Sequence, residues 1–148
     1  MNLLIEPFKK YAVFSGRSTR TEFWLFAFLY SAATMIANYV DTLGGVRHPV
    51  AGRFGMVELI VSLLLVMPML SVGARRLHDS GRSGWWMMLL YVPYLGWTFA
   101  RNQPSAELVS LGGVAVGFIA LFVFFLLPGD GESNEYGTSP RVKAPIAG

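Results

Sequence analysis

The sequence predicts an all-α integral membrane protein: a bundle of four transmembrane helices, with both the N and the C terminus cytoplasmic and a short amphipathic N-terminal interfacial helix. The chain of 148 residues is 53% hydrophobic and only 14% charged, which is too apolar for a soluble domain of this size. Its apolar residues fall into four blocks, each close to the length that a helix needs to cross a hydrocarbon core of about 30 Å. The basic residues lie between these blocks.

The N-terminal segment is expected to form the interfacial helix. Leu4, Phe8 and Tyr11 recur at helical spacing, with Lys9 and Lys10 between them. This pattern is typical of a short helix that lies on the inner leaflet and anchors the chain.

Each apolar block should be a helix, because backbone polar groups in hydrocarbon must be hydrogen-bonded within their own segment. Thr19 and Glu22 have the spacing of a capping box, so the first helix begins near Arg20. The four expected helices cover about residues 20–40, 56–74, 84–100 and 108–127.

The middle helices carry prolines. Pro68 removes one backbone hydrogen bond from the second helix and should kink it unless a neighbour such as Ser71 compensates. The third apolar block spans only about 24 Å and contains Pro93 and Gly96. We therefore expect the third helix to be shallow, kinked or re-entrant.

The fourth helix contains Gly113 and Gly117, a small-residue pair that lets another helix approach closely. The pair serves either packing within the chain or a homo-oligomer. The four helices form a single domain over residues 1–137, and residues 138–148, rich in small residues and proline, form a disordered cytoplasmic tail.

The distribution of basic residues predicts the orientation of the chain, because Lys and Arg resist translocation across the membrane. With four crossings, nine of the twelve Lys and Arg residues lie on the side that holds both termini. That side should be cytoplasmic. The net charge of +3 then reflects bases that flank membrane segments and meet anionic lipid, and does not indicate nucleic-acid binding.

This topology places three polar segments, residues 16–22, 75–84 and 128–137, on the cytoplasmic side, where they are expected to converge. They supply a candidate binding cluster for a partner or an anionic headgroup. Its members are Arg17, Arg20, Glu22, Arg75, Arg76, His78, Asp79, Arg82, Asn134 and Tyr136.

The segment 75–84 is read as one short loop that carries the most chemistry. In a functional interpretation its arginines bind phosphate, while Asp79 and His78 act as an acid–base pair. In the alternative, the arginines are positive-inside anchors, Asp79 pairs with an arginine and Ser83 caps a helix. The adjacency of His78 and Asp79 favours the alternative, because neighbouring residues on a helix do not face each other.

Within the spans, Glu58 and Asn38 are the candidate intramembrane polar residues. An ionisable group in a span is costly and is a functional candidate by default. Glu58, however, lies about one turn from the outer end of its helix, where it can reach the headgroups or pair with Arg53.

Other chemistries have little support in the sequence. The chain has no cysteine, which excludes disulfides and thiolate ligands, and His48 and His78 are assigned to opposite sides of the membrane, so no metal site is expected. No catalytic residue or cofactor site is predicted, because neither a serine-nucleophile elbow nor a phosphate-cradling loop is present.

The motifs resemble those of domain-of-unknown-function family 805, a family of small bacterial inner-membrane proteins. They run from Phe14 to Trp24, from Arg75 to Trp86, and from Leu127 to Gly129 with Asn134 to Gly137. The resemblance implies a four-helix inner-membrane fold with cytoplasmic motifs, and implies no activity, cofactor or catalytic residue. Residues 101–107 form a polar insertion where the family joins its last two apolar stretches more tightly.

The leading hypothesis is a non-enzymatic bacterial inner-membrane protein whose arginine-rich motifs bind a protein partner or anionic lipid. Two alternatives stay open. One is an enzyme that acts on a phosphate-bearing lipid, with Arg75, Arg76 and Arg82 gripping phosphate and Asp79 or His78 as base. The other is a small transporter or channel subunit that uses Glu58.

Overall fold

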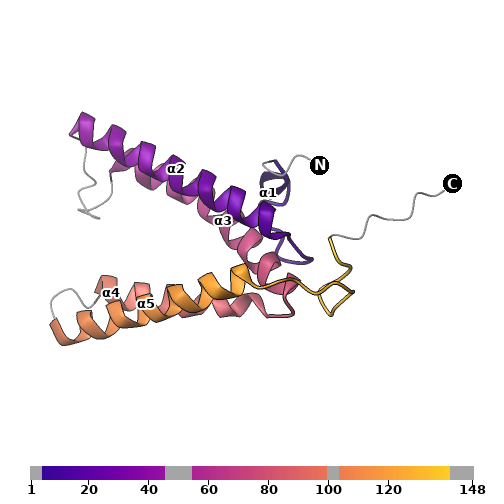
Figure 1. Cartoon of the computed structure of the whole chain (residues 1–148). Helices are drawn as coiled ribbons and strands as arrows, with labels where there is room; N and C mark the ends of the chain where they lie inside the picture. Colours follow the sequence, from indigo (N-terminus) through magenta and orange to yellow (C-terminus); the bar gives the residue numbers. More distant parts are fainter. Residues whose placement is uncertain (1–4, 46–54, 100–103, 141–148) are drawn as a thin grey trace. The chain divides into compact units, whose positions relative to one another are not determined.

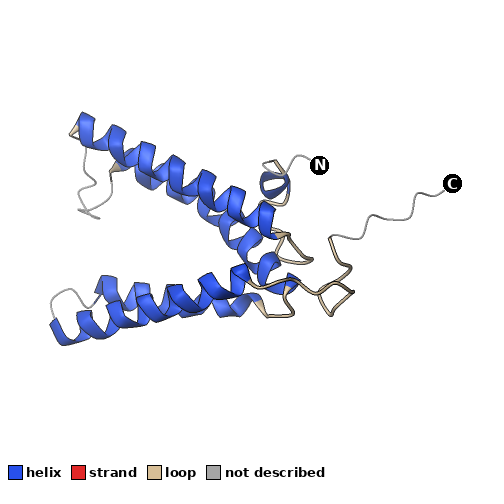
Figure 2. Cartoon of the chain, in the orientation of Figure 1, coloured by secondary structure: helices blue, strands red, loops and turns tan. Residues whose placement is uncertain are grey.

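The computed structural model describes residues 5–45, 55–99 and 104–140. Within these ranges all regular structure is helical (Figure 2), apart from bridge residues at Gly55, Asn134 and Gly137, of which the last two pair with each other, and the all-α prediction is confirmed for them. The elements in Figure 1 are α1 (Glu6–Lys9), α2 (Arg20–Gly44), α3 (Met56–Asp79), the 3₁₀ turn η1 (Gly84–Met87), α4 (Met88–Phe99) and α5 (Pro104–Leu126).

The chain divides into two compact units. Unit 1 consists of Met1–Phe14 and Thr21–Val72, and unit 2 consists of Ser15–Arg20 and Gly73–Gly148. The predicted disordered tail falls outside the described residues from position 141 onward. The single domain predicted over residues 1–137 stays a prediction.

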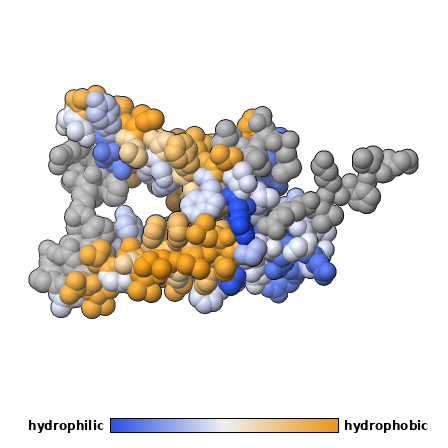
Figure 3. Space-filling view, viewed as in Figure 1, coloured by the Kyte–Doolittle hydropathy of each residue, from blue (hydrophilic) through white to orange (hydrophobic). Residues whose placement is uncertain are grey.

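Three helical stretches in the described ranges are long and apolar enough to cross a membrane: Arg20–Gly44, Met56–Asp79 and Leu108–Leu126. In the most apolar 18 residues of each stretch, only 17%, 22% and 17% respectively are buried inside the protein. Most of the apolar side chains therefore face outward, as lipid-facing residues do. Figure 3 shows hydrophobic residues on the surface along α5 and the shorter helix α4. With its 12 residues, α4 is too short to count as a fourth candidate span.

Two helices extend further than the hydropathy blocks predict. The first was expected to end near residue 40 but continues to Gly44, and the second was expected to end near residue 74 but continues to Asp79. Apolarity marks the part of a helix that lies in lipid, whereas the helix itself ends where its backbone is capped. The fourth predicted helix likewise begins earlier, at Pro104.

In unit 1, the N-terminal segment packs on α2 and α3. Among the described residues, one turn of the predicted interfacial helix is present, as α1, and Leu4 lies outside them. The Phe8 ring packs edge-on against Phe26, with 5.4 Å between ring centres. The hydroxyl of Tyr11 donates to the carbonyl of Leu64 (2.7 Å), the carbonyl that Pro68 leaves without its helical donor. Tyr11 therefore compensates for this proline, while the expected residue, Ser71, donates to other carbonyls.

The far ends of α2 and α3 are joined by polar contacts. The carboxylate of Asp41 on α2 accepts hydrogen bonds from the backbone N–H groups of Val57 (3.1 Å) and Glu58 (2.8 Å), and so caps the N-terminus of α3. Gly55 is required beside it, because a Cβ there would overlap the Asp41 carboxylate. This cap has no signature in the sequence, because the capping residue is not adjacent to the helix.

In unit 2, α4 packs along α5 through the small-residue pair. An added Cβ at Gly113 would lie 3.0 Å from the ring of Pro93, and one at Gly117 would overlap the carbonyl of Leu89. Of the two uses predicted for the pair, the structure shows packing within the chain. An oligomer that uses the same two glycines would have to share them with α4.

Candidate functional site

The candidate site begins at the C-terminal end of α3, which carries much of the segment predicted to be a loop. Arg75 to Asp79 lie in the last turns of this helix. The N–H of Arg82 donates to the carbonyl of Leu77 (3.0 Å) and the N–H of Gly81 to that of His78 (3.1 Å), with Gly81 at a φ of 67°. This is a Schellman motif. It explains why the helix ends at Asp79, just before Gly81, and not where its apolar run ends.

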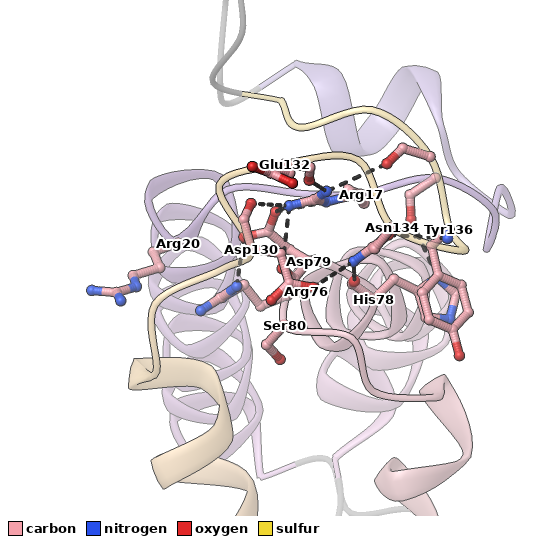
Figure 4. Close-up of polar contacts among 12 residues, drawn as sticks. Arg17, Arg20, Arg76, His78, Asp79, Ser80, Asp130, Glu132, Asn134 and Tyr136 are labelled. Atoms are coloured by element: carbon pink, nitrogen blue, oxygen red, sulfur yellow. Dashed lines mark hydrogen bonds and ion pairs between the residues drawn. The ribbon is translucent and has the colours of Figure 1, made fainter.

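Asp79 is the centre of the site, and its side chain is fully buried between two arginines (Figure 4). Its Oδ1 accepts from Nε of Arg17 at 3.0 Å and lies 2.9 Å from Nη2 of the same residue. Its Oδ2 accepts from Nη1 of Arg76 at 2.8 Å. Two cations thus share one buried carboxylate, and backbone carbonyls supply further acceptors to both arginines.

Arg17 ties the N-terminal polar segment to the segment that follows α5. Its Nη1 donates to the carbonyls of Glu132 (2.6 Å) and Gly137 (3.3 Å), and its Nη2 donates to the carbonyls of Asp79 (3.3 Å) and Asp130. Every guanidinium nitrogen of Arg17 therefore has an acceptor within the chain.

Arg76 connects α3 to the end of α5. Its Nε and Nη2 donate to the carbonyl of Phe125 (3.3 and 3.2 Å), and Nη2 also donates to that of Leu127. Arg20 donates from Nε to the same Leu127 carbonyl (2.9 Å). The last C=O groups of a helix have no partner within it, so these arginines cap α5.

The segment after α5 closes on the site through backbone contacts. The N–H of Asp130 donates to the carbonyl of Asp79 (2.7 Å). Buried Gly129 lies so close that a Cβ there would overlap the Asp79 carboxylate and approach the Asp79 carbonyl oxygen to 2.9 Å. Only glycine fits at this position.

His78, Asn134 and Tyr136 form a second set of contacts beside the cluster. The ring of His78 stacks on that of Tyr136 (3.9 Å between centroids, 5° between planes), and its Nδ1 lies 3.2 Å from the carbonyl oxygen of Gly16. Asn134 donates to the carbonyl of His78 (2.9 Å) and to the carboxylate of Asp130 (2.8 Å). A hydrogen bond to Glu135 raises the pKa of Tyr136 above its ordinary value of 10.0.

The structure brings the three predicted polar segments together, but it gives their residues different positions. Arg17, Arg76 and Asp79 form the buried cluster, while His78, Asn134 and Tyr136 form the set beside it. Glu22 and Arg75 are buried at 3% and 1% exposure, and the carbonyl of Arg75 accepts from the N–H of Ser18 at 3.0 Å.

Arg82 lies outside the cluster. It donates to the carbonyl of Ser80 (3.1 Å), and its guanidinium carbon lies 4.6 Å from the centre of the Phe124 ring, within the range of a cation–π interaction. Glu58 and Asn38 belong to unit 1, where they bond to each other at 2.8 Å. Arg53, the other partner considered for Glu58, lies outside the described residues.

The geometry does not assemble the acid–base pair of the enzymatic interpretation. Asp79 is occupied by Arg17 and Arg76, whereas His78 faces Gly16 and Tyr136. Within the described ranges no group of three or more His, Cys, Asp or Glu residues could hold a metal ion. The cluster joins three segments of the chain through ion pairs and hydrogen bonds.

The profile of the family described as Protein of unknown function (DUF805) matches residues 11–138, which is the span that holds the whole cluster. The chain belongs to this family. It is 30% identical to inner membrane protein YhaI of Escherichia coli (strain K12), over 95% of this chain and 97% of that protein. It is 34% identical to inner membrane protein YhaH of the same organism, over 97% of this chain and 99% of that protein.

No solved structure gives a significant match. The family resemblance deduced from the motifs is thus confirmed, and with it a transmembrane protein whose relatives reside in the inner membrane. Of the predicted polar insertion at residues 101–107, positions 101–103 lie outside the described residues and α5 begins directly after them.

Proposed function

We propose that the chain is a non-enzymatic inner-membrane module that binds anionic lipid headgroups at its cytoplasmic end. The observation that carries this proposal is that the arginines differ in how many of their donors are bonded within the chain. Arg17 and Arg76 donate from every guanidinium nitrogen to oxygens of their own chain. Arg20 and Arg82, both half-buried, keep donors that have no partner among the described residues.

These two arginines are the candidate phosphate ligands. Figure 4 shows the guanidinium group of Arg20 pointing away from Asp79. Arginine forms charge-assisted, often bidentate hydrogen bonds with phosphate, and a basic residue close to an anionic leaflet contributes about 1 kcal/mol to binding. Both arginines belong to unit 2, whose polar segments the buried cluster joins.

The same contacts support four crossings. Arg17, before α2, is bonded to the carbonyls of Asp130 and Glu132, after α5, so these two segments share one side of the membrane and the number of crossings between them is even. Because α2 and α3 account for two crossings, α4 and α5 supply the other two. The turn η1 adds to α4, and at about 2.0 and 1.5 Å per residue their 4 and 12 residues reach about 26 Å, enough for a slightly thinned bilayer.

The orientation follows from charge. In this topology the side with the cluster carries nine of the twelve Lys and Arg residues, so the positive-inside rule places it, and both termini, in the cytoplasm. The proposed anionic ligand is abundant there, because the cytoplasmic leaflet carries anionic lipid.

Lipid selectivity tests the proposal. In nanodiscs containing equal amounts of phosphatidylglycerol and phosphatidylcholine, the wild-type protein should retain the anionic lipid preferentially in native mass spectrometry. The double variant Arg20→Gln, Arg82→Gln should retain about 30-fold less, since each arginine contributes about 1 kcal/mol and about 1.4 kcal/mol corresponds to a tenfold change in affinity. High salt should weaken the preference of the wild-type protein by screening.

Arg101→Gln is the control for charge, because it removes an arginine from the loop between the third and fourth predicted helices, which is predicted to lie outside. It should leave the preference unchanged. A wild-type protein that retains both lipids equally would refute lipid binding, and one that captures a specific protein without lipid preference would favour the partner hypothesis instead.

A further inference from the structure

Unit 2 contains an apolar groove between η1, α4 and α5. It has a volume of about 650 Å³, within the range of about 300–1,000 Å³ typical of small-molecule sites. Its walls include Leu89, Val92, Pro93 and Val116, and its lining is hydrophobic apart from Ser83. Such a lining suits a hydrocarbon ligand and does not suit a polar one.

The glycines of α5 create this space. Gly113 and Gly117 draw α4 close, because their missing side chains admit Pro93 and the backbone of Leu89. Gly112 also lines the groove, but a Cβ there would meet no atom within 4 Å. The absence of a side chain at Gly112 therefore leaves open volume and is not needed for helix contact.

One end of the groove adjoins a cation. Trp86 lines the groove and packs edge-on against Phe124, with 5.4 Å between ring centres. Arg82 covers the ring of the same Phe124 at 4.6 Å. Trp85, 78% exposed, and Trp86 have the character of residues at the membrane–water interface. The end of the groove that Trp86 lines therefore has a cation beside it, and we call this end its mouth.

We propose that this groove holds one acyl chain of an anionic phospholipid whose phosphate is bound by Arg82. This inference rests on the proposed function and assigns its ligand a site. The charge at the mouth argues for a lipid and against a second transmembrane helix, because an apolar helix would offer Arg82 no anion. The groove supplies the chain contacts that surface binding of a headgroup lacks.

Photo-crosslinking tests the site in nanodiscs that carry phosphatidylglycerol with a diazirine in its acyl chain. In the wild-type protein the crosslinks should map to the groove, at Leu89 and Val116. Arg82→Gln should lower the yield there about fivefold, as the loss of one basic residue predicts. A phosphatidylcholine probe with the same chain should give a similarly reduced yield.

Gly112→Leu adds a side chain to the groove at a position where the new Cβ meets no atom within 4 Å, and it should abolish these crosslinks. Val109→Phe is its control, because it adds a similar number of carbon atoms to an exposed position on α5 outside the groove, and it should change nothing. Since wild-type mapping needs no variant, the test remains valid even if Gly112→Leu folds poorly.

The outcomes separate the two proposals. Wild-type crosslinks spread evenly over α2, α3 and α5, or an undiminished yield in folded Gly112→Leu, would overturn the groove site. If phosphatidylglycerol is still preferred in that case, the proposed function stands. If the wild-type protein shows no preference for the anionic lipid, both proposals fail.

Discussion

Replacing Asp79 by Asn is expected to lower the free energy of unfolding by about 3–5 kcal/mol, the cost of removing one partner from a buried ion pair. The Asp79 side chain is fully buried between Arg17 and Arg76. The variant keeps the shape of the side chain but removes the negative charge that two buried guanidinium groups share, and it turns an amide donor toward one of them. Unfolding in detergent, followed by circular dichroism, measures the loss.

Glu132→Gln is the control for charge. Arg17 contacts only the backbone carbonyl of Glu132, whose side chain is exposed, so removing this charge should change stability by no more than about 0.5 kcal/mol. Equal stability of Asp79→Asn and the wild-type protein would mean that the cluster does not hold the polar segments together.

Gly129→Ala should destabilise the protein by about 1–3 kcal/mol, the usual cost of overpacking. The new methyl group would overlap the carboxylate of Asp79, which two arginines hold in place, and it would press on a backbone oxygen. The segment cannot retreat without breaking the hydrogen bond between Asp130 and Asp79. The same unfolding measurement checks this expectation.

Gly131→Ala is the matched control two residues along the chain. A Cβ at Gly131 meets no atom within 4 Å, so the same substitution should be close to neutral. If the two alanine variants unfold alike, then the approach of the C-terminal segment to Asp79 is looser than the structure has it.

The long helices were the most predictable part of the fold, because apolar runs of membrane length leave few alternatives. The capping-box signal also located the start of α2 at Arg20. The helix ends were less predictable. α3 extends beyond its apolar run to Asp79 because a Schellman motif at Gly81 ends it, and hydropathy does not register that motif.

The candidate site was predictable in its residues but not in its bonds. Arg17, Arg76 and Asp79 stand out in the sequence by residue type, whereas most of the arginines' acceptors are backbone carbonyls, which every residue carries. The functional interpretation therefore assigned to phosphate the donors of Arg76, which the chain itself uses. Likewise, nothing in the sequence links Tyr11 to the carbonyl freed by Pro68.

Asn38 and Glu58 illustrate the same limit within the membrane. The sequence identifies both as polar groups at a comparable depth, but only the structure shows that they bond to each other. The amide of Asn38 on α2 donates a hydrogen bond to the carboxylate of Glu58 on α3, so each polar group has a partner on the neighbouring helix. The pairing gives both residues a structural role, so their presence in the spans does not require a transport function.

Cysteine labelling from the two sides of the membrane tests most directly whether the polar segments before α2 and after α5 share one side. The chain has no cysteine of its own, so Ser15→Cys and Ser133→Cys, at exposed positions before α2 and after α5, each report without background. An impermeant maleimide should spare both in spheroplasts and label both in inverted vesicles, with Gly52→Cys, in the loop predicted to lie outside, showing the reverse. Labelling of the two serine positions from opposite sides would contradict both the shared cluster and the even number of crossings.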